Sequence, residues 1–416
     1  MRRLAPALAG VAAALLLLAP TARASSAIRY GIQDDGWIAN GPGTLAERLD
    51  RIAALGVDVV RFDLRWNEIA VSPDPATWNW DAPDAVLAGL RARRIAPVLT
   101  LVGTPSWANG GRASNWAPAS GTSFAAFARA AAQRYSWVRD WTVWNEPNTP
   151  IELRPTTAST YVRLLLNPAY AAIHSVDRGA IVAGGVTAPR ANRTGVGPIA
   201  WLRGMRAAHA RFDVYAHHPY PGSPHETPFA GGCHSCTSIT MANLPALLRE
   251  LQRDFPGKHV WLTEYGYQTN PPDPFFGVSL ARQAAFIGMA ALRAYELPRV
   301  DMLIHYIFQD DSQLGGWQSG LVTAGGEAKP ALEAFAQPLA EVRRHGRSVV
   351  VWGQVRPGTG PQPYRLERLV GGSWRSVGAT RRTSSRGYFT RTLVAARGTY
   401  LRVASPYGAG AAISLS

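Results

Sequence analysis

Lysine, long apolar segments and glycine-rich loops are scarce or absent in this sequence of 416 residues. The 43 basic side chains are almost all arginine, because Lys258 and Lys329 are the only lysines. No apolar segment reaches the roughly 20 residues that a membrane-spanning helix needs, so we expect no stable membrane anchor. No glycine-rich loop follows an early strand, which argues against an open sheet that binds a dinucleotide.

Cysteine occurs only twice, as Cys233 and Cys236 in the segment Gly-Gly-Cys-His-Ser-Cys-Thr. In a cytosolic protein this spacing would suggest redox chemistry or half of a zinc site. No second cysteine pair is present to complete a zinc site, and the N-terminus predicts export. We therefore predict a short local disulfide between Cys233 and Cys236, and neither a metal site nor a cofactor.

The N-terminal segment has the pattern of a secretory signal peptide. Two arginines after Met1 precede an apolar segment rich in alanine and leucine, and small residues stand at Ala22 and Ala24. This pattern predicts cleavage after Ala24 and a secreted protein, with residues 1–24 removed. The remaining chain is long enough for one large domain and an additional module.

The net charge of +15 has two interpretations. It favours an anionic partner, such as an acidic polysaccharide or a charged cell envelope, or it reflects a genome that uses arginine wherever a surface cation suffices. Because the arginines are scattered and form no long basic run, we favour the second interpretation. No nucleic-acid-binding module accompanies the charge, so we expect no nucleic acid partner.

Short apolar segments alternate with helical patterns eight times over residues 25–343, the last helix being expected to run to Val342. This alternation predicts a parallel (β/α)8 barrel, with a doubly wound open sheet as the main alternative. Beyond residue 343 the pattern changes to short, alternating, β-prone segments separated by glycine, serine and proline. Residues 344–416 therefore predict a small immunoglobulin-like β-sandwich, with either a structural or a carbohydrate-binding role.

Two predicted strands end on a glutamate. The fourth ends in Trp-Asn-Glu-Pro, which places Glu146 at its exit, and the seventh ends in Thr-Glu-Tyr-Gly, which places Glu264 there. The active site of such a barrel lies at the C-terminal ends of its strands, where these two strands are almost opposite each other. A facing pair of carboxyl groups is what glycoside hydrolysis requires, one as general acid and one as nucleophile.

These motifs resemble the large clan of retaining barrel glycosidases that includes families 5 and 39. The resemblance covers residue 28 to about residue 340 and implies that Glu146 is the acid/base and Glu264 the nucleophile. It also implies that Asn145 holds the 2-hydroxyl of the sugar.

Other positions match the clan. Arg61 resembles the arginine beside the nucleophile, although an ion pair with Asp63 is an alternative role. His218-Pro219-Tyr220 resembles the clan's His-x-Tyr, whose tyrosine bonds the nucleophile.

Aromatic side chains are candidates for the sugar-binding walls. Many clan members carry a tryptophan at the end of the eighth strand, where this chain has Tyr306-Ile307-Phe308. Trp317, further along, is our candidate replacement. Trp107, after the third strand, is a second candidate, with ordinary core packing as its alternative.

We therefore predict a secreted, monomeric glycosidase that cleaves β-linked oligo- or polysaccharides with retention of configuration. Two alternatives stay open. The barrel binds carbohydrate without catalysis, or the enzyme trims an exopolysaccharide that its own cell makes.

Overall fold

The computed structural model describes residues 25, 27–191, 194–232, 237–356 and 359–416. The predicted signal peptide and the predicted Cys233–Cys236 disulfide lie outside the described residues. No helix among the described residues is both long and apolar enough to cross a membrane.

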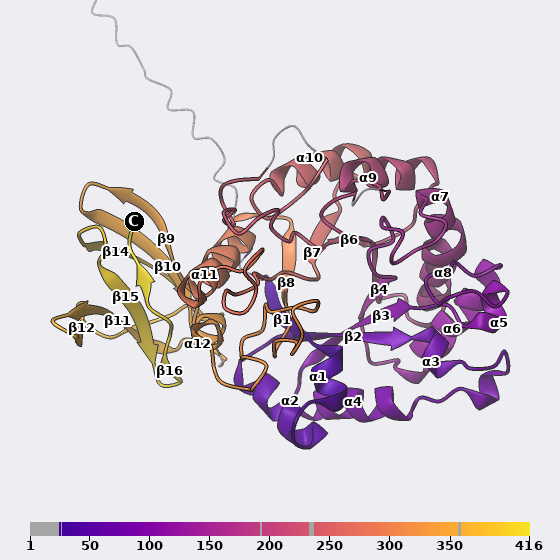
Figure 1. Cartoon of the computed structure of the whole chain (residues 1–416), viewed down its shortest axis with the longest axis horizontal. Coiled ribbons are helices and arrows are strands. Elements are labelled where there is room, and N and C mark those ends of the chain that lie inside the picture. Colours follow the sequence, from indigo (N-terminus) through magenta and orange to yellow (C-terminus); the bar gives the residue numbers. More distant parts are fainter. Residues whose placement is uncertain (1–24, 26, 192–193, 233–236, 357–358) are drawn as a thin grey trace, which may run out of the picture.

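The first part of the chain is a closed barrel of eight parallel strands in sequential order, which confirms the predicted fold class (Figure 1). The strands are β1 Arg29–Gln33, β2 Val59–Arg65, β3 Ala96–Val102, β4 Asp140–Val143, β5 Ile181–Thr187, β6 Val214–His217, β7 His259–Leu262 and β8 Val300–Tyr306. Most of their side chains are buried, as expected where helices cover the outside of a barrel and side chains fill its interior.

Amphipathic helices cover the barrel. Helix α10, for example, buries Leu247, Leu248 and Leu251 and exposes most of its polar side chains, the spacing of a single apolar face. The longer helices are α2 Leu45–Ala54, α4 Asp81–Ala92, α6 Gly121–Arg134, α8 Asn167–Val176, α9 Pro198–Ala207, α10 Pro245–Asp254, α11 Leu280–Glu296 and α12 Pro330–Ala336. The shorter helices are α1 Asp35–Asn40, α3 Trp66–Ile69, α5 Ser106–Asn109, α7 Ala158–Tyr161, the 3-10 helix Pro75–Thr77 and the π-helix Val162–Leu166, which joins α7 to α8.

The C-terminal region is a two-sheet β-sandwich, also as predicted in class. The first sheet has the order β14-β10-β9; the second has the order β12-β11-β15-β16, with β13 paired to β11 and β17 to β15. Their bounds are β9 Leu339–His345, β10 Ser348–Gln354, β11 Pro363–Val370, β12 Ser373–Ser376, β13 Arg381–Arg382, β14 Tyr388–Val394, β15 Tyr400–Ser405, β16 Gly408–Ala409 and β17 Ile413–Ser414.

The expected end of the last barrel helix is wrong. The sequence predicted a helix that runs to Val342, but α12 ends at Ala336 and β9 begins at Leu339. Pro338 lies between them, and proline disfavours helical backbone in the residue before it. The β-rich region therefore begins five residues before the expected boundary at residue 344.

The first sheet of the sandwich packs against helix α11 of the barrel. The ring of Tyr295 lies 5.2 Å from that of Trp352 and 4.8 Å from that of Tyr388, centre to centre. Gly288, in the middle of α11, allows the closest approach, because a Cβ atom there would lie 2.3 Å from the carbonyl oxygen of Leu339.

Replacement of Gly288 by alanine tests this contact. Alanine favours an isolated helix by about 1 kcal/mol, whereas forcing an extra carbon into a packed interior costs about 1–3 kcal/mol. We expect Gly288→Ala to lower the thermal unfolding temperature by several degrees. Gly315→Ala is the control, because a Cβ there meets no atom within 4 Å. An unchanged or raised unfolding temperature for Gly288→Ala would contradict the close approach.

Candidate active site

Glu264 follows β7 and lies at the bottom of the barrel opening, 8% exposed. Three side chains surround its carboxyl group. Arg61 from β2 donates a hydrogen bond to Oε1, and Tyr220 donates one to Oε2 at 2.9 Å. Nδ1 of His218 lies 3.6 Å from Oε2.

These neighbours set the ionisation of Glu264. Burial alone raises the pKa of a carboxyl group, because it penalises the charged form. Here the charges of His218 and Arg61 and the hydrogen bonds from Arg61 and Tyr220 outweigh burial, so the pKa of Glu264 lies below its ordinary value. The carboxylate is therefore held in the ionised form that a nucleophile requires.

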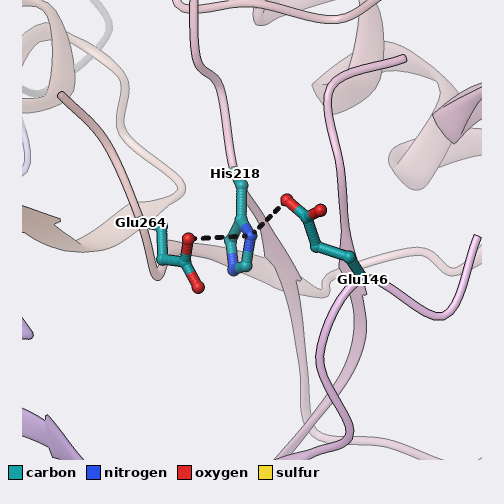
Figure 2. A group of neighbouring side chains, drawn as sticks. All are labelled: Glu146, His218 and Glu264. Carbon is teal, nitrogen blue, oxygen red and sulfur yellow. Dashed lines mark hydrogen bonds and ion pairs between the residues drawn. The ribbon is translucent and has the colours of Figure 1, made fainter. Parts of the chain in front are cut away.

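Glu146 stands across the opening, just after β4. His218 lies between the two glutamates (Figure 2), with Nδ1 at 2.9 Å from Oε1 of Glu146. One carboxyl oxygen of Glu146 and one of Glu264 lie within 4.8 Å of each other. The backbone at Glu146 has a φ of 36°, in the left-handed region that non-glycine residues rarely adopt. Strain of this kind persists only where the surrounding structure enforces it, and it clusters at functional sites.

His218, rather than its neighbour His217, faces the two glutamates. Its Nε2 lies 3.1 Å from the hydroxyl of Thr263, which fixes the ring between the strands. His217 points elsewhere, toward Thr187 and the carbonyl of Ile239, and burial lowers its pKa to about 3. Only one member of the His-His pair therefore belongs to the site.

Arg61 is fully buried and connects five strands of the barrel. Besides Glu264, it donates hydrogen bonds to Gln33 at 2.5 Å, to Thr100 at 2.9 Å and to Asn145 at 2.9 Å. The alternative partner considered from the sequence, Asp63, lies at 3.9 Å, so this ion pair is the more distant of the two. Asn145 thus stands beside Glu146 with its carbonyl oxygen fixed by Arg61.

A cavity of about 370 Å³ opens onto this group. Its wall includes Trp317 and Tyr306 as well as both glutamates and Asn145, so Trp317 faces the same space as the two glutamates. Trp107 does not line this cavity. Its ring meets Trp66 edge-on at 5.6 Å, in the alternative packing role.

Five further carboxyl groups line the same cavity. They are Asp34, Asp35, Asp63, Glu152 and Asp311. Burial, with repulsion from Asp63, raises the pKa of Asp35 to about 7, and burial with repulsion from Glu146 raises that of Glu152 to about 7. Glu152 lies in the loop after β4, and the sequence does not determine the path of this loop. The one sequence signal for its placement is that it stands six residues after Glu146.

Asp34 has a structural role. Its side chain caps helix α1 through the backbone N–H of Trp37 at 3.0 Å. It also accepts hydrogen bonds from the backbone N–H groups of Phe308 and Gln309, after β8. Asp34 therefore connects the first and last strands at the rim of the cavity.

Within the described residues, Glu146, His218 and Glu264 form the one cluster of acidic and histidine side chains close enough to share a metal ion. The Arg61 guanidinium already binds the Glu264 carboxylate. A divalent cation at the same carboxylate would be repelled by that fixed positive charge. These three side chains therefore suit acid–base and nucleophilic chemistry better than metal binding.

No protein-family model and no curated protein matches the sequence. Solved structures do. A family 39 glycoside hydrolase from the gut symbiont Bacteroides cellulosilyticus has a TM-score of 0.63 at 16% identity, over 90% of this chain and 80% of that chain. The GH39 enzyme from Xanthomonas axonopodis pv. citri has a TM-score of 0.59 at 16% identity, over 90% and 93%. A glucosidase from Croceicoccus marinus has a TM-score of 0.59 at 14% identity, over 92% and 95%.

At these identities the likeness shows a shared fold. Because it covers nine-tenths of the chain, it extends beyond the barrel into the C-terminal sandwich.

The raised pKa of Glu152 predicts a pH-dependent gain in stability on its neutralisation. Its folded-state pKa of about 7 lies above the ordinary 4.5, so ionisation opposes folding as the pH rises through this window. We expect Glu152→Gln to stabilise the protein at pH 8 by on the order of 1 kcal/mol, after allowance for solvent screening, and to have little effect at pH 4. Thermal unfolding of the variant and the wild type at pH 4 and pH 8 measures this difference in stability.

Glu68→Gln is the control, because that side chain is 66% exposed. An equal shift for Glu152→Gln at both pH values would show that the Glu152 carboxyl does not titrate abnormally.

Proposed function

We propose that this chain is a secreted, retaining glycoside hydrolase that cleaves β-O-glycosidic bonds, with Glu264 as nucleophile and Glu146 as general acid/base. The observation that carries the proposal is the pair of facing carboxyl groups, with oxygens within 4.8 Å of each other. Retaining enzymes place their carboxyl groups about 5–5.5 Å apart, whereas inverting enzymes leave about 6.5–9.5 Å for a water molecule.

The different surroundings of the two glutamates support their separate roles. Glu264 is enclosed by donors that favour its charged form. Glu146 is the more open of the two, with its side chain 21% exposed, and its hydrogen-bond partner is His218. A general acid must exchange its proton with the leaving group and then with water, so access to the cavity suits this role.

The reaction follows from these positions. An oxygen of Glu264 attacks the anomeric carbon while Glu146 protonates the departing glycosidic oxygen, so a carbon–oxygen bond to the enzyme forms as the glycosidic bond breaks. Glu146, now ionised, removes a proton from water, and the resulting hydroxide displaces Glu264. Tyr220 and Arg61 hold the Glu264 carboxylate in place before attack and accept its return as leaving group.

The charge of the cavity indicates the substrate class. Five further carboxyl groups line it, and the cation among the lining residues, Arg65, already lies 3.5 Å from Asp63 and 3.9 Å from Glu68. A sugar that carries its own carboxylate would be repelled there. We infer that the unit bound at the cleavage point is uncharged.

Replacement of each glutamate by alanine distinguishes their roles, because added azide should give glycosyl azides of different configuration with the two variants. In Glu264→Ala, turnover should be abolished, and added azide should attack the substrate directly and give the inverted glycosyl azide. The Glu146→Ala variant should hydrolyse substrates with poor leaving groups roughly 10²–10⁴-fold more slowly than the wild type. Dinitrophenyl glycosides should still form the glycosyl-enzyme, which azide converts to the retained product. NMR of the glycosyl azides gives the product configuration for each variant.

The Glu68→Gln variant again serves as control and should retain normal rates. Normal turnover by Glu264→Ala on every substrate would overturn the assignment. Retained azide product from Glu264→Ala would exchange the two roles.

The acidic cavity predicts discrimination by substrate charge. We expect nitrophenyl β-glucoside to be hydrolysed with a kcat/KM at least tenfold above that of nitrophenyl β-glucuronide, since a buried unpaired charge costs a few kcal/mol. The two compounds share a leaving group and differ at one carbon. A glucuronide hydrolysed as fast as the glucoside would show that the cavity carboxyl groups do not face the sugar.

A further inference from the structure

Positive charge is concentrated in the C-terminal sandwich. Residues 339–416 contain thirteen arginines and two acidic residues, whereas residues 25–338 contain 27 basic and 26 acidic residues. The sandwich thus has a net charge of +11 and the barrel of +1. If arginine served only as a general surface cation, both parts would have a similar ratio of basic to acidic residues. The interpretation favoured from the sequence is therefore inadequate, because scatter along the chain concealed a clustering between domains.

Six of these arginines lie on the second sheet of the sandwich, and we name them the arginine sheet. They are Arg365, Arg368, Arg375, Arg381, Arg382 and Arg402, from β11, β12, β13 and β15. Strands β11 and β12 lie on the side of the sandwich away from the barrel, whereas β16 and β17 approach helices α12 and α11 (Figure 1). Arg402 is half-buried and the other five are exposed.

These arginines lack sufficient negative partners. Arg368 and Arg375 stand directly opposite each other on β11 and β12, an arrangement of like charges that destabilises a sheet. Glu367 is the one acidic residue of these strands, and it is shared by Arg365 at 2.7 Å and Arg402 at 2.9 Å. Within the described part of the chain, no carboxylate pairs with the other four members.

Aromatic side chains accompany the arginines of the outer face, Arg365, Arg382 and Arg402. Strand pairing places Arg368, Arg375 and Arg381 on the opposite face, where they are exposed. Side chains of a strand alternate between faces, and Leu401 and Val403 of β15 point into the sandwich core, so Tyr400 and Arg402 point outward. The guanidinium of Arg402 lies 4.2 Å from the ring centre of Trp374 on β12. Tyr400 is 50% exposed. Flat aromatic faces stack on the apolar faces of sugar rings.

We propose that the arginine sheet binds a polyanionic glycan, a polysaccharide whose repeating units carry carboxylate or sulfate groups. The guanidinium fork matches such groups in a bidentate manner, and exposed cations on both faces of neighbouring strands suit a flexible chain of repeated anions that passes over the sheet. The acidic cavity repels the same groups. The sandwich would therefore hold the charged part of a polymer while the barrel receives an uncharged unit, although binding itself does not depend on the proposed hydrolysis.

Binding of the full chain to defined polymers tests this. We expect binding to polygalacturonate and dextran sulfate, weakening as salt increases, and none to uncharged dextran. The variant Arg368→Gln/Arg375→Gln/Arg382→Gln should lose affinity roughly tenfold or more at low salt, because charge contacts there are direct. It spares Arg365 and Arg402, which keep Glu367 paired.

The matched control is Arg129→Gln/Arg163→Gln/Arg178→Gln, which removes the same charge from exposed positions on the barrel. It should retain affinity to within twofold or so, and both variants should keep the circular dichroism and hydrolysis rates of the wild type. Equal losses in both variants would overturn the proposal, because net charge alone would then explain binding. So would tighter binding of phosphatidylglycerol vesicles or of DNA than of either glycan, which would assign the surface to a lipid or a nucleic acid.

Discussion

The contact between Arg61 and Glu264 is the constraint on which the catalytic end of the barrel depends. Removing two charges from water is expensive, and a buried pair repays that cost only with good geometry and further hydrogen bonds. Arg61 meets the condition through Gln33, Thr100 and Asn145, on β1, β3 and the exit of β4. One guanidinium thus sets the positions of both glutamates: Glu264 directly, and Glu146 through the neighbouring Asn145.

His218 distinguishes this pair of carboxyl groups from a simple repelling dyad. Two carboxylates within 4.8 Å would disfavour each other's charge. The imidazole between them accepts or donates a proton toward Glu146 at 2.9 Å while its ring also lies 3.6 Å from Glu264. Together with Arg61, it keeps the pKa of Glu264 below its ordinary value despite burial.

Much of this was predictable from the sequence, for a physical reason. A barrel requires its site residues at strand exits, so two short motifs after apolar strands located Glu146 and Glu264 without knowledge of the loops. Arg61 and Tyr220 were found through the resemblance to the glycosidase clan. Glu152 was not assigned, because its placement depends on a loop path, and loops carry no periodic pattern. Trp107 was expected near the sugar, but a single tryptophan near a strand exit has the same sequence signal in a core as in a cavity.

The segregation of charge was missed for a related reason. Whether charges are balanced depends on which side chains meet on the folded surface. The arginines of the second sheet are spread over some forty positions of the sequence, and only strand pairing brings Arg368 against Arg375.

The cavity itself is built at a cost to stability. Asp35 and Glu152 have pKa values raised to about 7, which means that their ionisation opposes folding near neutral pH. A barrel selected for stability alone would replace them with neutral side chains. Of the described carboxyl groups at this opening, Glu264 is the one that accepts a hydrogen bond from the fully buried guanidinium of Arg61, because Asp63 lies 3.9 Å away. Glu264 is thus stabilised as an anion, whereas the raised pKa values of Asp35 and Glu152 let these two groups retain protons for hydrogen bonds to hydroxyl groups.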